Sequence, residues 1–378
     1  MFLHTEWVLI RLCLAVEKPA FVSSADVLQK LQSTFATSKI FAPLSNSQRK
    51  RPSKGDDQVF KMGHGGTLDP LAAGILIVGV GRATKHLQSY LACSKTYETV
   101  VLFGASTDSY DCTGAIGQRG PYKHVTKELV EERLAQFHGT IMQVPPVYSA
   151  LKINGIKACE YAREGKALPR ELESREMTVD ECTLLEWFGG GQHSFNVLGD
   201  EELVQAPAAR IRLKVCSGFY VRSFAHDLGI ACGTRSHMAA LLRTRQANFS
   251  IGRLTESRDL VTALTYADLD AGEDVWGPKL RPQLEAWVVA NPKSTGHING
   301  RDGDAKRRFM EEKELRPKQR FRGEWVADTK KERIKQQGGK YKGKWGRKTA
   351  NASTTAVDTS ADVHAQNVSK AASLPAEV

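Results

Sequence analysis

The stretch GHGGTLDPLAAGILIVGVG (63–81) places a single acid, Asp69, in glycine-rich and apolar sequence. Pro70 restricts the preceding residue to an extended backbone, which fixes the direction of the carboxylate. Gly65 and Gly66 allow the chain to turn tightly or to lie close to a ligand. The run LAAGILIVGVG is typical of a buried strand. We therefore expect one acid at the rim of an apolar floor, although an isolated Asp-Pro would more often cap a helix.

The composition favours an anionic partner. The chain has 378 residues, of which 41% are hydrophobic, with a net charge of +11 and a pI of about 9.3. Such an excess of positive charge attracts nucleic acid first and an acidic membrane surface second. The sequence contains no apolar run of the length that crosses a membrane. Its seven cysteines are scattered and never form C-x-x-C, which indicates a reducing compartment and no zinc knuckle.

The beginning of the chain predicts a strand rather than a targeting signal. MFLHTEWVLIRLCLAVEKP (1–19) is apolar but carries Glu6 and Arg11. It has neither the basic start and cleavage site of a secretory signal nor the Arg and Ser content of a mitochondrial presequence. We expect residues 1–32 to hold the first strand and the start of the folded domain.

Residues 61–256 are predicted to form the main folded body. Ile211, Leu213 and Val215 alternate with polar neighbours, which is typical of a strand. Thr126 and Gly139 bracket an amphipathic helix pattern. Strands interleaved with helices indicate an α/β or α+β body. The expected strands are 95–104 and 209–224, and the expected helices are 126–139, 222–233 and 236–245.

The flanking segments differ in composition from this body. Residues 33–60 are expected to be a polar insertion loop; its basic cluster RKRPSK (49–54) fits a nuclear localisation signal, an RNA contact or a solvated loop. Residues 257–290 are expected to pack on the body as an extension. Residues 291–378, basic and then small and polar, are expected to be largely disordered. The basic part would either hold RNA through phosphates or serve only solubility.

Several further blocks follow one another in a fixed order: KP with SS (18–24), KTYE (95–98), QVPPVYSALKINGIKACEYAREG (143–165), SGFYVRSFAHDLG (217–229) and LLRTR (241–245). With GHGGTLDPLAAG they resemble the TruB family of tRNA pseudouridine synthases, in particular its fungal nuclear and mitochondrial branch. The resemblance covers about residues 15–255. It implies the pseudouridine synthase fold, an α/β (α+β) domain with a central mixed, mostly antiparallel sheet flanked by helices and loops.

The resemblance implies an isomerase that converts a uridine of the tRNA T loop, usually at position 55, to pseudouridine. The C1′–N1 bond breaks, the uracil turns, and a C1′–C5 bond forms without water, metal or cofactor. The base must first be flipped out of the loop. The implied partner is the T arm of tRNA, with messenger RNA as an open second substrate. We expect a monomer that does not bind membranes and is located in the nucleus and mitochondrion, with the cytoplasm left open.

The resemblance assigns three residues to catalysis. Asp69 takes the place of the family's catalytic aspartate, as a nucleophile or as a base that removes a ribose proton. Tyr97 matches the tyrosine that stacks on the target base and assists proton transfer at C5; without the family it would be a core tyrosine. Arg222 matches the arginine that pairs with the acid, since a nearby cation keeps a buried carboxylate ionised. Its alternative is a surface strand arginine.

The resemblance also implies residues that bind RNA or shape the pocket. His64 matches a histidine that contacts the everted nucleotides, and Leu242 matches an apolar wall of the uracil pocket. By sequence alone they would be a turn histidine and a core leucine. Lys18 is expected either to contact a phosphate or to lie under the pocket as a structural lysine, and Lys152 to face RNA on a turn that leads into a helix. The whole set is His64, Gly65, Gly66, Leu242, Lys18 and Lys152.

The chain departs from the family pattern in its first block and after residue 255. Phe21 stands where the family usually has glycine, and Ser23 replaces threonine. No PUA-type RNA-binding domain is recognisable after residue 255. The guide-dependent dyskerin branch, which normally carries that domain, is therefore a weaker alternative. Two further alternatives are an RNA-folding protein with secondary or lost catalysis, and a glycosidase or nucleosidase that releases uracil.

Overall fold

The computed structural model describes residues 12–42, 59, 61–197, 200–251 and 260–290. The first eleven residues, the basic cluster 49–54 and the tail 291–378 lie outside these ranges, so what the sequence predicts for them stays a prediction. Within the described ranges, no helix combines the length and the apolar sequence that a membrane crossing requires.

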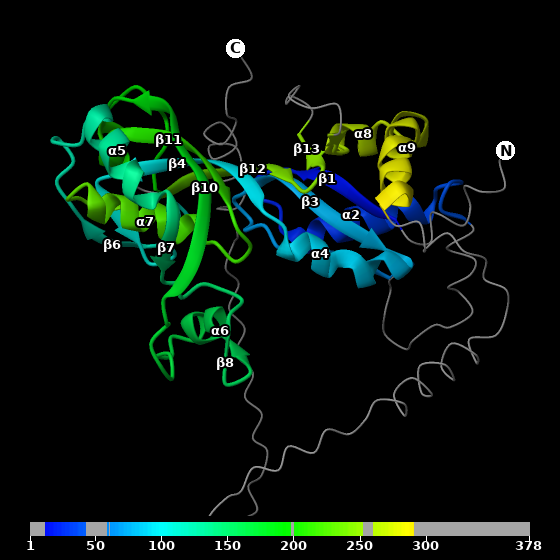
Figure 1. Cartoon of the computed structure of the whole chain (residues 1–378), viewed down its shortest axis with the longest axis horizontal. Helices are drawn as coiled ribbons and strands as arrows, with labels where there is room; N and C mark the ends of the chain where they lie inside the picture. The colour runs from blue at the N-terminus through cyan, green and yellow to red at the C-terminus, as the bar shows by residue number, and fades with distance from the viewer. Residues whose placement is uncertain (1–11, 43–58, 60, 198–199, 252–259, 291–378) are drawn as a thin grey trace, which may run out of the picture. The chain divides into compact units, whose positions relative to one another are not determined.

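Fourteen strands are described, most of them in one sheet (Figure 1). They are β1 (Cys13–Lys18), β2 (Met62–His64), β3 (Ala73–Val80), β4 (Lys95–Phe103), β5 (Ala105–Thr107), β6 (Ile116–Arg119), β7 (Gly139–Gln143), β8 (Lys152–Ile153), β9 (Ile156–Lys157), β10 (Arg175–Phe188), β11 (Ala208–Val215), β12 (Ser236–Gln246), β13 (Phe249–Ser250) and β14 (Val261–Thr262).

The main sheet has the order β1-β3-β12-β4-β11-β10-β7, with β2 on β3 and with β13 and β14 continuing from β12. Neighbouring strands run antiparallel except in the pairs β3–β12 and β13–β14. β5 pairs with β6, and β8 with β9, in two separate hairpins. The predicted mixed, mostly antiparallel sheet is therefore confirmed.

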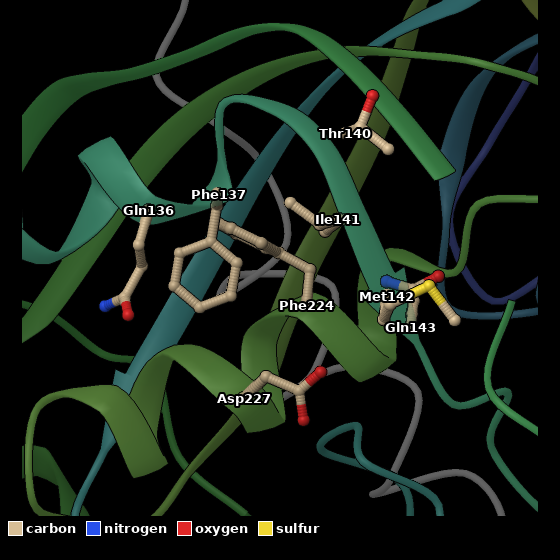
Figure 2. Close-up of a pocket in the computed structure, with 8 residues that line it drawn as sticks. All are labelled: Gln136, Phe137, Thr140, Ile141, Met142, Gln143, Phe224 and Asp227. Atoms are coloured by element: carbon tan, nitrogen blue, oxygen red, sulfur yellow. The ribbon is translucent and has the colours of Figure 1, made fainter. Parts of the chain in front are cut away.

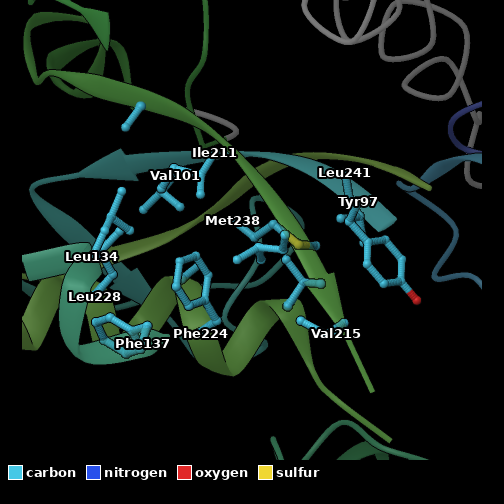
Figure 3. Packing of buried hydrophobic residues seen from close by; sticks show 14 of the residues in the cluster. Tyr97, Val101, Leu134, Phe137, Ile211, Val215, Phe224, Leu228, Met238 and Leu241 are labelled. Atoms are coloured by element: carbon cyan, nitrogen blue, oxygen red, sulfur yellow. The ribbon is translucent and has the colours of Figure 1, made fainter. Parts of the chain in front are cut away.

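Helices cover this sheet through two large apolar clusters. The described helices are α2 (Ser24–Ala36), η2 (Gly81–His86), α4 (Leu87–Ala92), α5 (Lys127–Leu134), η3 (Ala135–Phe137), α6 (Ala158–Arg163), η4 (Glu201–Gln205), α7 (Val221–Ala231), α8 (Tyr266–Asp270) and α9 (Glu273–Ala290). The first cluster joins α5, η3 and α7 to β4, β10, β11 and β12 (Figure 3), with Phe137 edge-on to Phe224 at 5.1 Å between ring centroids. The second joins α2, α8 and α9 to β1 and β3.

The sequence predicts several of these elements correctly. The apolar run after Asp69 forms β3, which is almost wholly buried. α5 begins after Thr126, whose side chain accepts a hydrogen bond from the Leu129 amide, as expected for an N-cap. α7 ends before Gly233, which has a φ of 70° and so supplies the left-handed conformation of a helix C-cap.

The prediction of a helix over 236–245 is wrong, because this segment forms β12. Ser236 is a good N-cap, and the Met, Ala and Leu residues that follow favour helices. The segment lies between β3 and β4, where nearly every side chain is buried. A central strand buried on both faces loses the alternating pattern that identifies strands. Tertiary context therefore overrides local propensity here.

Two other expectations need correction. The strand expected over 209–224 ends at Val215, because the chain turns at Gly218, with a φ of 88°, and enters α7 at Val221. The segment after Pro146 was expected to be a turn leading into a helix. It forms the β8–β9 hairpin first and only then α6.

Residues 260–290 are tied to the first strand. The side chain of Gln283 in α9 is fully buried; its Oε1 accepts a hydrogen bond from the Ala15 amide at 2.7 Å, and its Nε2 donates to the Thr262 carbonyl at 3.0 Å. Trp276 of the same helix packs against Phe35 of α2. This segment thus completes the apolar layer over β1.

Gly74 marks the place where three strands meet. It is paired with Lys18 of β1 on one side and with Arg243 of β12 on the other. Its φ is 101°, and a Cβ built on it would lie 2.2 Å from the Arg243 carbonyl oxygen. Only glycine permits β12 to approach β3 so closely at this point.

We expect Gly74→Ala to lower the free energy of unfolding by about 4 kcal/mol or more, because backbone atoms would have to move apart. Gly139→Ala is the matched control: its φ is 84°, but nothing lies within 4 Å of its Cβ position. The control should lose only about 1–2 kcal/mol from the left-handed conformation itself. Urea unfolding measures both, and equal losses would contradict the steric role of Gly74.

Candidate active site

Asp69 lies in the loop of residues 65–72 between β2 and β3, here called the Asp69 loop. Its backbone carbonyl accepts a hydrogen bond from the Ala72 amide at 3.0 Å. The Ser24 hydroxyl exchanges two hydrogen bonds of 3.0 Å with the backbone of Leu68. Leu68 and Leu71 are buried, whereas the Asp69 side chain is 34% exposed. The predicted acid at the rim of an apolar surface is thus what the structure contains.

The guanidinium of Arg222 contacts the carboxylate of Asp69 through two nitrogens. Nε lies 2.7 Å from Oδ2, and Nη2 lies 3.4 Å from Oδ1. Arg222 also donates to the carbonyls of Ser109 at 3.1 Å and Tyr148 at 2.9 Å. Its side chain is only 8% exposed, so it is not a surface strand arginine. Charge-assisted pairs of this two-point kind fix both distance and orientation.

A second carboxylate, Asp111, faces the same guanidinium, with Oδ2 at 3.9 Å from Arg222 Nε. Asp111 is buried, and its Oδ1 accepts hydrogen bonds from the Ser109 hydroxyl and from the amide and hydroxyl of Thr113. Sequence reasoning did not select Asp111. The sequence signal that could have identified it is Asp-Cys-Thr-Gly (111–114). In such a turn the Asp side chain accepts a hydrogen bond from the backbone amide two residues later, as Asp111 does from Thr113.

Tyr97 lies on β4, opposite Leu213 of β11 and Arg243 of β12. It is buried in the same apolar cluster as Leu68 and Leu71, which flank Asp69 closely in the sequence. Figure 3 shows its ring at the margin of that cluster, with the hydroxyl pointing away from the other labelled side chains. Tyr97 thus shares the apolar surroundings of the Asp69 loop.

Lys18 lies beneath the Asp69 loop with no exposed surface. Its Nζ donates to the carbonyls of Pro19 at 2.9 Å, Val22 at 2.6 Å and Pro70 at 3.0 Å. These contacts fit the structural alternative for Lys18 and not a phosphate contact. Burial lowers the pKa of Lys18 to about 8, and the negative charge of Asp69 opposes that shift.

His64, Gly65 and Gly66 are held at the other end of the same loop. Arg243, fully buried, donates to the carbonyls of Ile75 at 2.7 Å and Gly66 at 3.0 Å. Burial, and then the neighbouring Arg243 charge, lower the pKa of His64, which favours the neutral imidazole. A neutral imidazole can contact nucleotides by hydrogen bonding or stacking.

Gly65 is fixed from both sides. Its amide donates to the Ile77 carbonyl at 2.8 Å, and its carbonyl accepts from Gln246 Nε2 at 2.7 Å. Gln246 and Arg243, which anchor the glycines, both belong to β12. From the block LLRTR (241–245), the sequence predicts a site role only for Leu242, and it does not reveal that Arg243 and Gln246 anchor the glycines.

The two remaining site residues lie in different settings. Leu242 is half-buried on β12, opposite Ala73, directly after the Asp69 loop. Lys152 is exposed on the β8–β9 hairpin. The Tyr148 carbonyl, just before that hairpin, accepts a hydrogen bond from Arg222.

A cavity of about 300 Å³ lies elsewhere on the domain (Figure 2). Phe137, Phe224 and Asp227 contribute to its lining, together with residues of β7, and it contains none of the predicted site residues. Burial raises the pKa of Asp227 to about 6. In the described part of the chain, no group of three or more His, Cys, Asp or Glu side chains is placed to hold a metal ion.

Comparisons with known proteins bear on this arrangement. The family model "TruB family pseudouridylate synthase (N terminal domain)" matches residues 54–221. The chain is 31% identical to tRNA pseudouridine synthase 4 of Schizosaccharomyces pombe, over 63% of this chain and 79% of that protein. It is 35% identical to pseudouridylate synthase TRUB1 of Mus musculus, over 76% and 79% respectively. It is 40% identical to tRNA pseudouridine synthase B of Parabacteroides distasonis, over 49% and 71%.

Among solved structures, the chain is similar to one from a Cbf5-Nop10-Gar1 complex. The TM-score is 0.46 and the sequence identity 20%, over 75% of this chain and 60% of that chain.

The buried Lys18 predicts a pH-dependent stability. Between pH 8 and its ordinary pKa of 10.5 the unfolded chain keeps the proton that the folded protein has released, so the free energy of unfolding rises with pH. The free energy of unfolding of the protein with Lys18 should rise by up to about 3 kcal/mol across this window, relative to that of Lys18→Met. Urea unfolding of both proteins at several pH values measures the difference. A constant difference would mean that the Lys18 pKa is not lowered.

Proposed function

Since this chain belongs to the TruB family of pseudouridine synthases, we propose that it converts a uridine in the T loop of tRNA, at position 55, to pseudouridine. The observation that carries the proposal is the two-point contact between Asp69 and the buried Arg222. It places a carboxylate against a guanidinium at an apolar surface. An ionised carboxylate beside a nucleoside is the group that glycosidic bond chemistry needs.

Asp69 acts on the ribose, either by attacking C1′ or by removing the proton from C2′. In both routes the C1′–N1 bond breaks while uracil stays in the site, rotates and joins C1′ through C5. In the first route the bond from Asp69 to C1′ breaks as the C1′–C5 bond forms, and in the second Asp69 returns the proton to C2′. The hydrogen on C5 is lost to solvent, and N1 gains a proton. Product and substrate are isomers, so no water is consumed. The apolar side chains around the Asp69 loop, Leu68 and Leu71 among them, favour this outcome because they limit water.

Arg222 orients the Asp69 carboxylate toward the substrate. Two further N–H groups donate to the Ser109 and Tyr148 carbonyls, so Arg222 cannot turn away from Asp69 without leaving these carbonyls unpaired. Asp111 faces the same Nε that contacts Asp69, at 3.9 Å, and acts as a positioning residue. Arg222 thus connects two separate segments, one with Ser109 and Asp111 and one with Tyr148, to the carboxylate of Asp69.

Tyr97 and Leu242 are proposed to receive the flipped base. Tyr97 belongs to the apolar cluster beside Asp69, and Leu242 stands opposite Ala73 at the end of the same loop. An aromatic ring and a half-buried aliphatic side chain suit the two faces of a pyrimidine. Everting the base costs a few kcal/mol of stacking, which such contacts offset in part.

The test uses a tRNA T-arm stem-loop labelled with tritium at C5 of uridine. Because C5 loses its hydrogen when it bonds to C1′, each turnover releases tritium. Asp69→Asn should reduce the rate at least about a thousandfold while RNA binding is retained. Asp180→Asn is the matched control, since Asp180 forms an exposed ion pair with Lys214 and should leave the rate unchanged.

Two outcomes would contradict the proposal. Pseudouridine formation by Asp69→Asn at the normal rate would remove Asp69 from catalysis. Free uracil in the reaction with the unchanged protein would point to a glycosidase instead.

A further inference from the structure

Phe21 has a backbone conformation that aromatic residues rarely adopt. Its φ is 62°, in the left-handed region, which is unfavourable for a bulky side chain. It is also one of the exposed large hydrophobic residues, with 42% of its surface accessible. Strain of this kind persists where the surrounding structure imposes it and is concentrated at functional sites.

The turn that holds Phe21, residues 19–22, is fastened to the Asp69 loop. Lys18 Nζ bridges the Val22 carbonyl of this turn and the Pro70 carbonyl, directly after Asp69. Ser24, just past the turn, is hydrogen-bonded to Leu68, directly before Asp69. Contacts on both sides therefore place Phe21 in the chain segment that borders the proposed catalytic carboxylate.

Packing does not explain the aromatic ring. Val22, the next residue, packs against the apolar cluster of α2, α8 and α9, whereas Phe21 belongs to none of the apolar clusters in the described part of the chain. No aromatic ring among the described residues stacks on it. Glycine or asparagine would adopt the same backbone more easily. The fold alone therefore gives no reason for phenylalanine at this position.

We propose that Phe21 is a stacking platform for a nucleobase of the RNA, next to the uridine that enters the site. An exposed, rigidly mounted ring stacks on any base, because every base presents a π-face. The Phe21 side chain is left exposed on a turn whose neighbours are hydrogen-bonded to the residues on both sides of Asp69. This inference rests on the proposed function, since it assigns a substrate contact to the same site.

The experiment compares Phe21→Gly, Phe21→Asn and Phe21→Tyr in tritium-release kinetics on the T-arm stem-loop, with thermal unfolding measured on each protein. Gly and Asn relieve the strain and remove the ring, so they should raise Tm while raising KM about fivefold or more, with kcat little changed. Tyr keeps the ring and should keep KM. Ala247→Gly is the control: Ala247 also has a positive φ, 52°, and its replacement should raise Tm with KM unchanged.

If the protein with Phe21 is active, and Phe21→Gly and Phe21→Asn have the same KM as that protein, the stacking role is overturned and the proposed function is left intact. A KM that rises equally for Phe21→Tyr would also overturn it. Absence of tritium release from the unchanged protein would instead contradict the proposed function, so the two failures are distinguishable.

Discussion

The geometry of the site depends on the contacts of the Arg222 guanidinium. It binds the Asp69 carboxylate and the carbonyls of Ser109 and Tyr148, and it faces Asp111, so three segments far apart in the sequence meet at one side chain of α7. An ion pair between a buried guanidinium and a partly exposed carboxylate adds little net stability, because desolvation of the guanidinium offsets most of the attraction. What it provides is geometry, since every donor is directed at a particular oxygen. The single, partly exposed carboxylate that results is the group the proposed chemistry uses.

The local sequence predicts the elements whose ends carry capping signals or whose apolar pattern is unambiguous. Thr126 and Gly233 mark helix ends correctly, and the apolar run after Asp69 is a strand. β12 could not be predicted in this way, because its composition favours a helix and its burial on both faces comes only from the assembled sheet. β12 pairs with β3 and β4, which lie more than a hundred residues earlier, and a short stretch of sequence contains no information about such distant partners.

The site residues likewise fall into those that the sequence identifies and those that only the folded structure reveals. Asp69 stands out in the sequence because of Pro70 and the glycines before it, and its partner Arg222 follows from the family resemblance. Asp111 and the anchoring role of Arg243 emerge only when distant segments are brought together. The burial of Lys18 decides between two alternatives that its sequence neighbours leave open. Nuclear and mitochondrial localisation stays a prediction that rests on the family resemblance.

The parallel contact between β3 and β12 has a consequence for biosynthesis. β3 ends at Val80 and β12 begins at Ser236, so the middle of the sheet stays open until most of the domain has left the ribosome. Until then, the apolar strands β3 and β4 have unpaired edges where β12 will insert, and such edges are templates for aggregation. The nascent chain must therefore be shielded, by its own helices or by chaperones, until this late central strand arrives.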